Sequence, residues 1–587
     1  MQVYHDTHLD VAWEWNPVQR LLGRVRGEIL AEMTGQGIAV DAGRLDDTAL
    51  LTRLVMKRCL YGVDLNRLAV ELAKLSLWLH SFTVGAPLSF LDHHLRWGNS
   101  VIGADVRTVE RAMKVTDSGQ FALFQGPFAG LLDLTAVMVE VAARADATLA
   151  DVQQSADAYA AFQRQLLPYK QALDLWVSQW FGDERPDRST RPDRSARPDR
   201  SARPDRSARP GSGAALDFMT IHSSDVLPAL RGEITVDARF QDAMARSRAL
   251  WEQQRFFHWD LEFPEVFIDL AGRDWAADGG FDAMIGNPPY VRQEQMSATK
   301  RYFAAAHAPV FDAAADLYVY FYHRGCQMLR RGGRLAYIVS NKWLRAGYGE
   351  PMRRYLAGQT AVEQIVDFGH APIFPDADTF PCIAVLRRPE VEPPAPVETE
   401  VCAFPREELG RSDLTAYVAG HRHRVPAGRF GAAPWSLEPP EIEHLVARIR
   451  GAGTPLSEFI GAKPYRGILT GLNEVFLIDT PTRDRLIATD PASDKVIVPY
   501  LRGQDIKRWA PQWAGLWMIL LKSSENFDWP WSRSGESAEA VFAHTFPSLH
   551  AYLKPHEDAL RKRQDQGRFW WELRSCDYYS AFEHSKI

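Results

Sequence analysis

The sequence lacks the features that place a protein in a membrane or outside the cell. It has no run of about 18 uncharged apolar residues, and its most apolar stretch, residues 68–91, is interrupted by charged residues and a proline. Its amino terminus has neither the basic start nor the apolar core of a secretory signal. We therefore expect a cytoplasmic protein with no membrane partner.

Cysteine and net positive charge are also scarce. The five cysteines are scattered without a C-x-x-C pair, which argues against a disulfide framework or a cysteine zinc site. The net charge of −6 argues against a protein that coats nucleic acid through charge alone. Residues 501–568 nevertheless alternate basic residues with tryptophans. That pattern suits phosphate contact and base stacking, or equally a tryptophan-rich core with a charged face.

A six-residue repeat interrupts the chain at residues 185–213, with arginine recurring every six positions. The repeat contains no large apolar side chain, so we expect an extended or disordered surface insertion. Alanine, leucine and polar residues recur at helical spacing over 108–180 and 225–255. These segments predict a helical insertion around the repeat.

Short apolar segments on both sides of this insertion are typical of central parallel strands. Helical patterns at 68–82, 316–329 and 349–356 separate several of them. Alternating strands and helices predict an α/β fold with an open sheet covered on both faces. After about Pro389 the alternation is lost, and we expect a second domain there. The predicted strands are residues 59–64, 281–285, 334–340, 362–368 and 381–386.

The clearest motif is Asn287-Pro288-Pro289-Tyr290, which follows the apolar segment 281–285 and Gly286. In an open α/β sheet, ligands bind at the carboxyl ends of the strands, where this tetrapeptide is expected. The same four residues can also form a simple turn. The position directly after a strand favours a functional site.

The motif has the chemistry needed to methylate adenine N6. The lone pair of this amine is delocalised into the ring, and two acceptors aimed at its N–H groups would localise it. The side-chain oxygen of Asn287 and the backbone oxygen of Pro288 can supply them. Pro288 and Pro289 stiffen the loop, and Tyr290 offers an aromatic face to an extruded base. We therefore predict that these four residues are catalytic.

A second motif is the apolar segment 60–63, which ends in Asp64 and leads into a helical pattern. A carboxylate at the tip of a strand can accept hydrogen bonds from two ribose hydroxyls of a nucleoside cofactor. An aspartate at this position is also a common helix N-cap. Asp64 is our candidate for cofactor binding.

In this order, the motifs resemble the TaqI-like adenine N6 methyltransferases of restriction-modification and phage-defence systems. Residues 61–66 are similar to the ribose-binding strand of that family, and residues 91–100 to its adenine-side cofactor loop. Asn99 stands where the family commonly has aspartate. The resemblance implies S-adenosylmethionine as cofactor, with Asp64 and Asn99 binding it, and double-stranded DNA as partner.

Further segments extend the resemblance. Residues 257–264 are similar to the approach to the catalytic loop, and 334–348 to a strand and loop that close over the target base. This makes Tyr348 a second residue for stacking on that base. Residues 465–474 and 499–506 resemble the C-terminal sequence-recognition domain of the same enzymes.

The implied fold is a Rossmann-like methyltransferase sheet with a helical insertion, followed by a mixed α+β target-recognition domain. The expected ranges are 1–104 for a partial cofactor-binding half, 105–255 for the insertion, 256–390 for the catalytic half and 391–587 for an incomplete recognition domain.

One family feature is missing. Members carry an Asp-Pro-x-x-Gly-Ser-Gly loop before the ribose-binding strand, and its glycines let the backbone approach the cofactor. Nothing before Tyr61 supplies it, because Gly35-Gln36-Gly37 follows a helical pattern. We expect that the chain begins after this loop.

Three alternatives to a self-sufficient adenine methyltransferase stay open. The chain could be a DNA-binding fragment without activity. It could be one half of a split enzyme whose missing segment comes from another polypeptide or defence-system subunit. A protein glutamine could also be the methyl acceptor, since a similar Asn-Pro-Pro-Tyr loop serves amide methylation, although a long recognition domain favours DNA.

We expect no metal. Two groups have ligand chemistry, but one lies at the terminus and the other inside the loop that resembles a cofactor loop. No cluster of acidic residues and lysine suggests a nuclease. The two groups are His5, Asp6, His8 and Asp10, and Asp92, His93 and His94.

Overall fold

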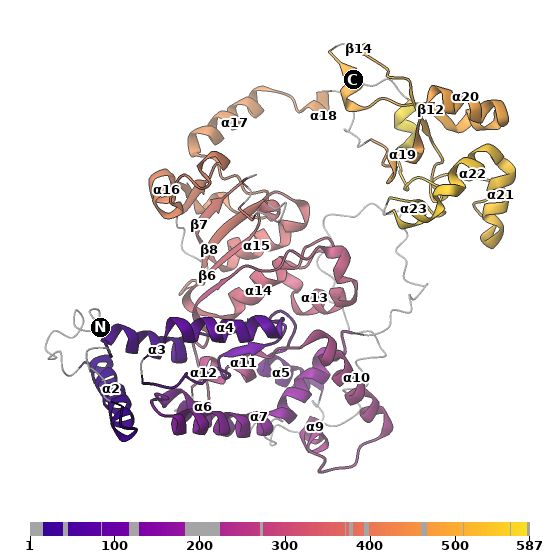
Figure 1. Ribbon diagram of the computed structural model, residues 1–587. Helices are drawn as coiled ribbons and strands as arrows, with labels where there is room; N and C mark the ends of the chain where they lie inside the picture. Colours follow the sequence, from indigo (N-terminus) through magenta and orange to yellow (C-terminus); the bar gives the residue numbers. More distant parts are fainter. Residues whose placement is uncertain are drawn as a thin grey trace. The chain divides into compact units, whose positions relative to one another are not determined.

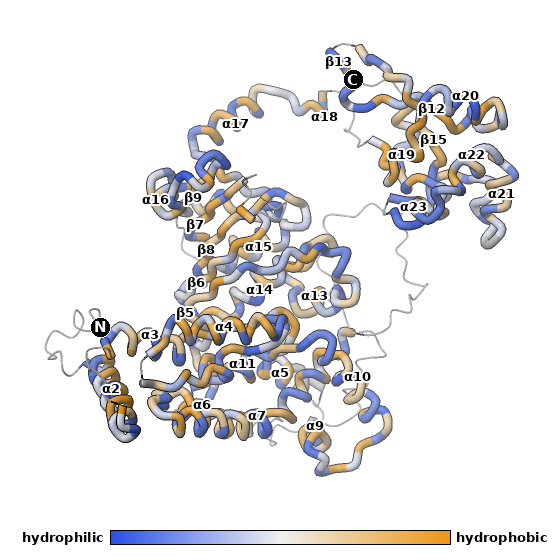
Figure 2. The backbone as a smooth tube through the Cα atoms, viewed as in Figure 1, coloured by the Kyte–Doolittle hydropathy of each residue, from blue (hydrophilic) through white to orange (hydrophobic). Residues whose placement is uncertain are grey.

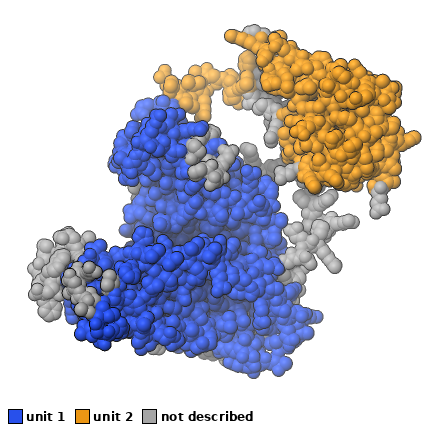
Figure 3. All heavy atoms as spheres, in the orientation of Figure 1, with its two compact units in different colours: residues 1–444 blue, residues 445–587 orange. Residues whose placement is uncertain are grey.

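The computed structural model describes residues 16–38, 45–83, 85–116, 128, 130–181, 223–269, 274–369, 371, 373–374, 380–391, 398–459, 467–508, 510–563 and 565–583. The repeat and the His5 to Asp10 group lie outside these residues. The chain divides into two compact units, Met1–His444 and Leu445–Ile587, which Figure 3 colours separately.

The first unit contains a six-stranded sheet with strand order β10-β9-β7-β8-β6-β5. Neighbours β5 and β6 are parallel, β8 is antiparallel to both β6 and β7, β7 and β9 are parallel, and β10 is antiparallel to β9. Four of the five predicted strands form in this sheet and the fifth forms β1 (Gly62–Asp64) in a separate pair, but the sheet is mixed rather than wholly parallel. The strands are β5 (Phe281–Gly286), β6 (Leu329–Ser340), β7 (Ala361–Asp367), β8 (Pro381–Arg387), β9 (Glu398–Ala403) and β10 (His423–Pro426).

Helices between the strands complete this α/β layer (Figure 1). Helix α14 (Tyr318–Met328) lies between β5 and β6 in the chain, and α15 (Glu350–Gln359) leads into β7. Both contribute to a core built largely from aromatic and aliphatic side chains of β6, β7 and β8. Two smaller helices of this region are α13 (Lys300–Ala306) and α16 (Leu414–His421).

A separate parallel pair, β1 (Gly62–Asp64) and β2 (Leu95–Trp97), carries the second predicted motif. Helix α4 (Arg67–His80) connects these strands, and Asn66 caps it by accepting a hydrogen bond from Leu68 N. Two helices precede the pair, α2 (Pro17–Gly35) and α3 (Asp47–Cys59), and pack on each other.

The predicted helical insertion is confirmed as a cluster of helices with its own core. Two short strands follow it, β3 (Ile268–Asp269) and β4 (Asp274–Trp275). The helices are α5 (Val106–Thr116), α6 (Leu131–Ala143), α7 (Leu149–Ser178), α9 (Ser223–Leu230), α10 (Ala238–Gln254), α11 (Trp259–Glu262) and α12 (Pro264–Phe267).

The second unit combines short strands and helices around a tryptophan-rich core. Its three-stranded sheet has the order β11-β15-β12, with antiparallel pairs. Helix α17 (Pro440–Ala452) spans the division between the units. The other elements are α18 (Leu456–Phe459), α19 (Asn473–Phe476), β11 (Leu477–Asp479), α20 (Thr480–Thr489), β12 (Ile497–Pro499), β13 (Ile506–Lys507), β14 (Ala510–Pro511), β15 (Leu516–Ile519), α21 (Ala538–Thr545), α22 (Pro547–Leu553) and α23 (Glu557–Lys562).

The division between the units differs from the sequence-based boundary at 390/391. Strands β9 and β10 lie beyond that boundary, yet they extend the sheet of the first unit through the pairing of β9 with β7. The compact units therefore divide after His444. Across the part of the chain that the structure describes, no helix is both long enough and apolar enough to span a bilayer.

Candidate functional site

The loop after β5 presents Asn287 to solvent. Asn287 and Pro289 are exposed, whereas Pro288 is buried. Within the described residues, the Asn287 carboxamide makes no hydrogen bond, so both of its polar atoms are available to a ligand. The Tyr290 hydroxyl is buried and has no partner there either. Burial, followed by the nearby Cys382, raises the pKa of Tyr290 to about 12.

Two hydrogen bonds hold this loop against the start of α14. Leu317 N donates to Val291 O at 3.0 Å, and Gln293 N donates to Asp316 Oδ1 at 3.3 Å. These contacts fix the chain just after Tyr290 to the helix that follows it. The predicted catalytic residues therefore sit on an anchored loop at the carboxyl end of a strand.

The end of the parallel neighbour β6 lies beside this loop in the sheet. Asn341, the first residue after β6, donates from Nδ2 to Asp367 Oδ1 at 2.8 Å, which ties it to the end of β7. Arg353 of α15 is buried and donates from Nε to Ala432 O and Ala433 O, both at 3.0 Å. Its Nη1 donates to Ala346 O at 2.9 Å and so holds the segment that leads to Tyr348.

Tyr348 is half-buried, and its hydroxyl lies 2.7 Å from the hydroxyl of Tyr318. Burial raises the pKa of both phenols; the Tyr348 hydroxyl adds to the rise at Tyr318, whereas the hydrogen bond with Tyr318 opposes the rise in the pKa of Tyr348. Cys382 also raises the pKa of Tyr318, as it does for Tyr290.

Asp64 and Asn99 lie on neighbouring loops at the carboxyl ends of β1 and β2. Gly98 N donates to Asp64 O at 3.0 Å, and Trp97 Nε1 donates to Leu65 O at 2.8 Å. The exposed Asp64 side chain accepts from Asn66 N at 2.6 Å, so it stabilises the turn before α4 without being its N-cap. The second carboxylate oxygen of Asp64 makes no hydrogen bond to a described residue and is open to a ligand there.

Asn99 has both a structural contact and a free donor. Its backbone N donates to Arg255 O at 2.7 Å, and its side-chain oxygen accepts from Val101 N at 3.3 Å. Its amide nitrogen makes no hydrogen bond to any residue that the structure describes. Of the predicted site residues, the structure thus brings together Asp64 and Asn99; Tyr348 contacts Tyr318, and among the described residues no hydrogen bond or ring contact joins Tyr348 to Tyr290. Among the described residues no hydrogen bond joins Asn287 to Asp64 or Asn99.

Sequence reasoning missed the residues that hold the loop containing Asn99. The Tyr302 hydroxyl donates to Gly103 O at 2.6 Å and accepts from Gly103 N at 2.8 Å. Trp259 Nε1 donates to Ser100 O at 2.9 Å. A side chain at Gly103 would place its Cβ 1.9 Å from Phe257 O, so only glycine fits there.

The segment 257–264 also contributes buried carboxyl groups. Asp260 Oδ2 accepts from Val106 N at 2.7 Å, and burial raises the pKa of Asp260 to about 7. Glu262 is fully buried as well, but Arg96 and Lys170 outweigh the opposing effect of burial and lower its pKa to about 2. These groups tie the helical insertion to β2 and the catalytic half.

The Asp92, His93 and His94 group does not converge on one point. The Asp92 carboxylate pairs with Lys74 at 2.5 Å, and His93 stacks on Phe90 with 5.5 Å between ring centroids. Burial lowers the pKa of His93 to about 2. His94 faces Glu265 at 3.2 Å. No group of three or more metal-ligating side chains gathers within the described ranges.

Some tryptophans of the second unit belong to its hydrophobic core. Trp531 is fully buried, donates from Nε1 to a carboxylate oxygen of Glu572 at 2.8 Å, and stacks on Trp529 at 4.8 Å. Arg563 is buried and donates to the backbone oxygens of Thr470 and Trp570 at 2.7 Å each. These residues stabilise the unit and are not available to DNA.

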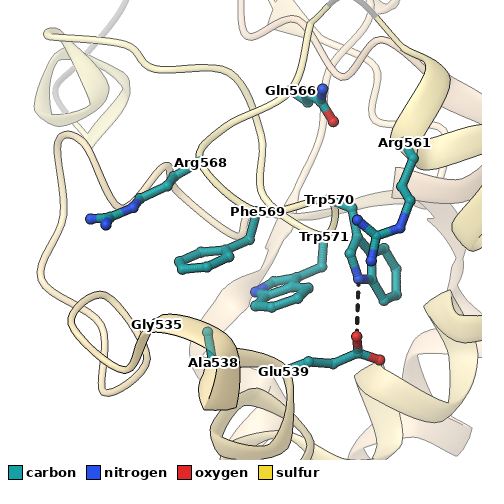
Figure 4. Close-up of a pocket in the computed structure, with 9 residues that line it drawn as sticks. All are labelled: Gly535, Ala538, Glu539, Arg561, Gln566, Arg568, Phe569, Trp570 and Trp571. Carbon is teal, nitrogen blue, oxygen red and sulfur yellow. Dashed lines mark hydrogen bonds between the residues drawn. The ribbon is translucent and has the colours of Figure 1, made fainter.

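A pocket of about 300 Å³ opens on the surface of this unit (Figure 4). Phe569 and Trp571 stack along one side with 4.9 Å between ring centroids, and Trp570 points toward Glu539 from the other. Arg561 and Arg568 lie at its rim. The pocket joins aromatic faces to positive charge in the region where the sequence predicts contact with DNA.

Comparison with known proteins identifies the family. The Eco57I restriction-modification methylase model matches residues 58–374, which is more than half of the chain and includes β1, β2, β5 and β6. The chain therefore belongs to the Eco57I restriction-modification methylase family. The predicted resemblance to methyltransferases of restriction-modification systems is confirmed at this level.

Two curated relatives illustrate the extent of the match. The chain is 28% identical over 323 residues to the Type II methyltransferase M.XhoI of Xanthomonas vasicola, covering 52% of this chain and 55% of that protein. It is 28% identical over 299 residues to the Type II methyltransferase M.PaeR7I of Pseudomonas aeruginosa, covering 49% and 47%. The chain spans about half the length of the curated relatives it matches.

Among solved structures, the Type IIL restriction-modification enzyme MmeI in complex with DNA matches with 13% identity and a TM-score of 0.30. This match covers 60% of this chain and 47% of that one. The α/β fold is shown by the six-stranded sheet and the helices between its strands.

Proposed function

We propose that this chain transfers a methyl group from S-adenosylmethionine to N6 of adenine in DNA, within a restriction-modification or phage-defence system. The observation that carries the proposal is the loop after β5, where Asn287 is exposed and unpaired among the described residues while Pro288 is buried. Membership of the Eco57I methylase family supports the same activity.

Asn287 and Pro288 act on the target amine. The Asn287 side-chain oxygen accepts one N6–H group, and the Pro288 backbone oxygen accepts the other. Both acceptors draw the nitrogen lone pair out of conjugation with the ring and toward the methyl donor. Because the loop is anchored at Val291, the acceptors are oriented before the base arrives.

Asp64 and Asn99 fit a nucleoside cofactor. The open carboxylate oxygen of Asp64 can accept from ribose hydroxyls, and the free amide nitrogen of Asn99 can donate to the ring of an adenine. When bound, S-adenosylmethionine supplies an electrophilic methyl group on sulfur. N6 forms the new C–N bond as the C–S bond breaks, and N6 then loses one proton to solvent.

Tyr290 and Tyr348 receive the extruded base in this proposal. Tyr290 lies in the same loop as Asn287 after β5, and Tyr348 follows the neighbouring strand β6. An adenine taken out of the duplex would stack on the Tyr290 ring. We propose that the second unit contacts the DNA backbone and bases, with the aromatic and basic pocket as one contact point.

The test combines cofactor binding with transfer. Isothermal titration of the purified chain measures its Kd for S-adenosylmethionine, and mass spectrometry of nucleosides measures N6-methyladenine in plasmid DNA from a methylation-deficient strain. Asn287→Ala is expected to keep the Kd and to lower transfer at least 100-fold. Glu294→Ala, at an exposed carboxylate of the same loop, serves as the matched control and should leave both unchanged.

The outcomes separate the alternatives. Binding without transfer to DNA by the folded wild-type chain would favour a chain that only recognises DNA. Transfer to a glutamine-containing peptide but not to DNA would identify a protein methyltransferase. Absence of cofactor binding by a folded chain would indicate an inactive DNA-binding fragment or one half of a split enzyme.

A further inference from the structure

Helix α10 of the insertion ends at a residue with an uncommon backbone conformation. Figure 2 shows α10 in mixed blue and orange, the pattern of a helix with one face against a core and the other in water. Arg255 caps this helix with φ 54° and ψ 52°, in the left-handed region. Among the described residues, only one other non-glycine residue has a positive φ. Glycine or asparagine is usual at such a helix end, so an arginine there indicates that its side chain has a role.

The backbone of Arg255 holds the loop that carries Asn99. Asn99 N donates to Arg255 O at 2.7 Å, and Asn99 forms a parallel bridge with Phe256, the next residue. In a continued helix the Arg255 carbonyl would point along the helix axis. The left-handed turn therefore allows this carbonyl to reach Asn99.

The side chain of Arg255 packs on two aromatic rings. Its guanidinium carbon lies 4.1 Å from the centre of the Trp97 ring and 4.5 Å from that of Trp251. It also pairs with Glu252 at 2.5 Å, and the side chain is only 18% exposed. A planar guanidinium held by an ion pair against two indole rings has little freedom to rotate. Arg255 therefore restrains the position of the Trp97 ring.

Trp97 extends this restraint to the loop that carries Asp64. Trp97 is the β2 residue that pairs with Asp64 of β1, and its Nε1 donates to Leu65 O at 2.8 Å. One edge of the indole thus holds the residue after Asp64, while the ring face contacts the guanidinium of Arg255. Arg255 restrains the Asn99 loop through its backbone and the Asp64 loop through Trp97.

We propose that Arg255 is a positioning residue for the nucleoside part of the cofactor, and that its carbonyl and guanidinium together set the separation of Asn99 and Asp64. Arg255 acts through these residues, so its loss should weaken cofactor binding and leave the methyl-transfer step unchanged. This inference rests on the proposed use of S-adenosylmethionine. The restraint on the two loops can be measured without the cofactor.

The first measurement uses the full chain without cofactor. Arg255→Asn removes the guanidinium, yet asparagine suits the left-handed conformation better than arginine does, so the unfolding midpoint of the first unit should be unchanged or higher. Hydrogen exchange read by mass spectrometry should become faster in peptides that contain residues 62–66 and 97–103. Arg248→Asn, at an exposed position of the same helix, is the matched control and should leave the exchange of both loops unchanged.

The second measurement separates binding from transfer. Isothermal titration of Arg255→Asn with S-adenosylmethionine should give a Kd about tenfold higher than that of the wild type. The transfer rate at saturating cofactor should stay within about twofold of the wild-type rate. Arg255→Lys keeps a charge beside Glu252 but has no planar group to pack on the indole rings, so it should also bind more weakly than the wild type.

The outcomes distinguish this inference from the proposed function. If the wild type binds the cofactor and Arg255→Asn binds it equally well, the positioning role is wrong and methyl transfer still stands. Unchanged exchange in the two loops, a lower unfolding midpoint, or an equal effect of Arg248→Asn would overturn the inference as well. If the wild type binds no S-adenosylmethionine while Arg255→Asn still loosens both loops, the proposed cofactor is wrong and the restraint by Arg255 is supported.

Discussion

The free energy of unfolding should respond differently when either of two tyrosines of one core loses its hydroxyl. The hydroxyl of Tyr302 donates to Gly103 O at 2.6 Å and accepts from Gly103 N at 2.8 Å, in a residue only 2% exposed. The hydroxyl of Tyr322 is fully buried and has no partner among the described residues. Replacement of either residue by phenylalanine removes one oxygen and leaves the ring in place.

The expected magnitudes follow from these contacts. Tyr302→Phe leaves two buried backbone groups of Gly103 unpaired, at about 1–2 kcal/mol each, so it should lower the free energy of unfolding by about 2–4 kcal/mol. Tyr322→Phe removes a buried polar group that has nothing to bond, and it should raise the same free energy by about 1 kcal/mol or leave it unchanged.

The assay must report on the first unit alone, because a chain with two compact units need not unfold in one step. Urea denaturation read by pulsed hydrogen exchange, with mass spectrometry of peptides from 296–330, provides this. Tyr302→Phe should also weaken S-adenosylmethionine binding about tenfold, since Gly103 ends the loop that carries Asn99. Equal destabilisation by both substitutions would refute the reasoning.

Three further predictions concern buried charged groups. The pKa of Asp260, raised to about 7, exceeds the unfolded value of about 3.9, so stability of the first unit should fall as pH rises from about 4 to 7. Asp260→Asn should flatten that pH dependence in urea unfolding at pH 5 and 8. Arg353→Met should destabilise the same unit by about 3 kcal/mol, whereas Arg354→Met, at an exposed neighbour, should cost under about 0.5 kcal/mol. Calorimetry should show that Arg563→Met lowers the Tm of the second unit, while Lys562→Met, at an exposed position, leaves it unchanged.

The elements of the sheet were predictable because their signal is local. The apolar segments 281–285 and 381–386 both form strands; about every second residue of the second is buried, whereas only Phe281 and Met284 of the first are even partly buried. The directions of the strands were not predictable: β8 runs antiparallel to β6, and the paired residues lie more than 40 positions apart in the sequence, so no local pattern reports their relative direction. The segment 398–403 carries the alternation of an ordinary strand, and nothing in it indicates that it pairs with β7.

The candidate site likewise has residues that could be predicted from the sequence and residues that could not. Asn287 and Asp64 could be located from sequence because each directly follows a strand, and strand ends are local features. Tyr302 could not be found this way, since its partner Gly103 is 199 residues distant and a buried tyrosine is usually only a core residue. Arg353 gave no signal either, because an arginine in a helix is normally solvent-exposed.

The anchoring contacts show how a long insertion can follow the loop that carries Asn99 in the sequence while segments beyond the insertion hold that loop. The loop after β2 precedes the helical insertion, yet Arg255, Trp259 and Tyr302 hold it, and all three follow most or all of that insertion. The loop position is therefore determined by segments adjoining the catalytic half rather than by the helices between. It follows that changes within the undescribed repeat should not move Asn99, whereas loss of the Tyr302 hydroxyl should, although it lies outside every recognisable motif.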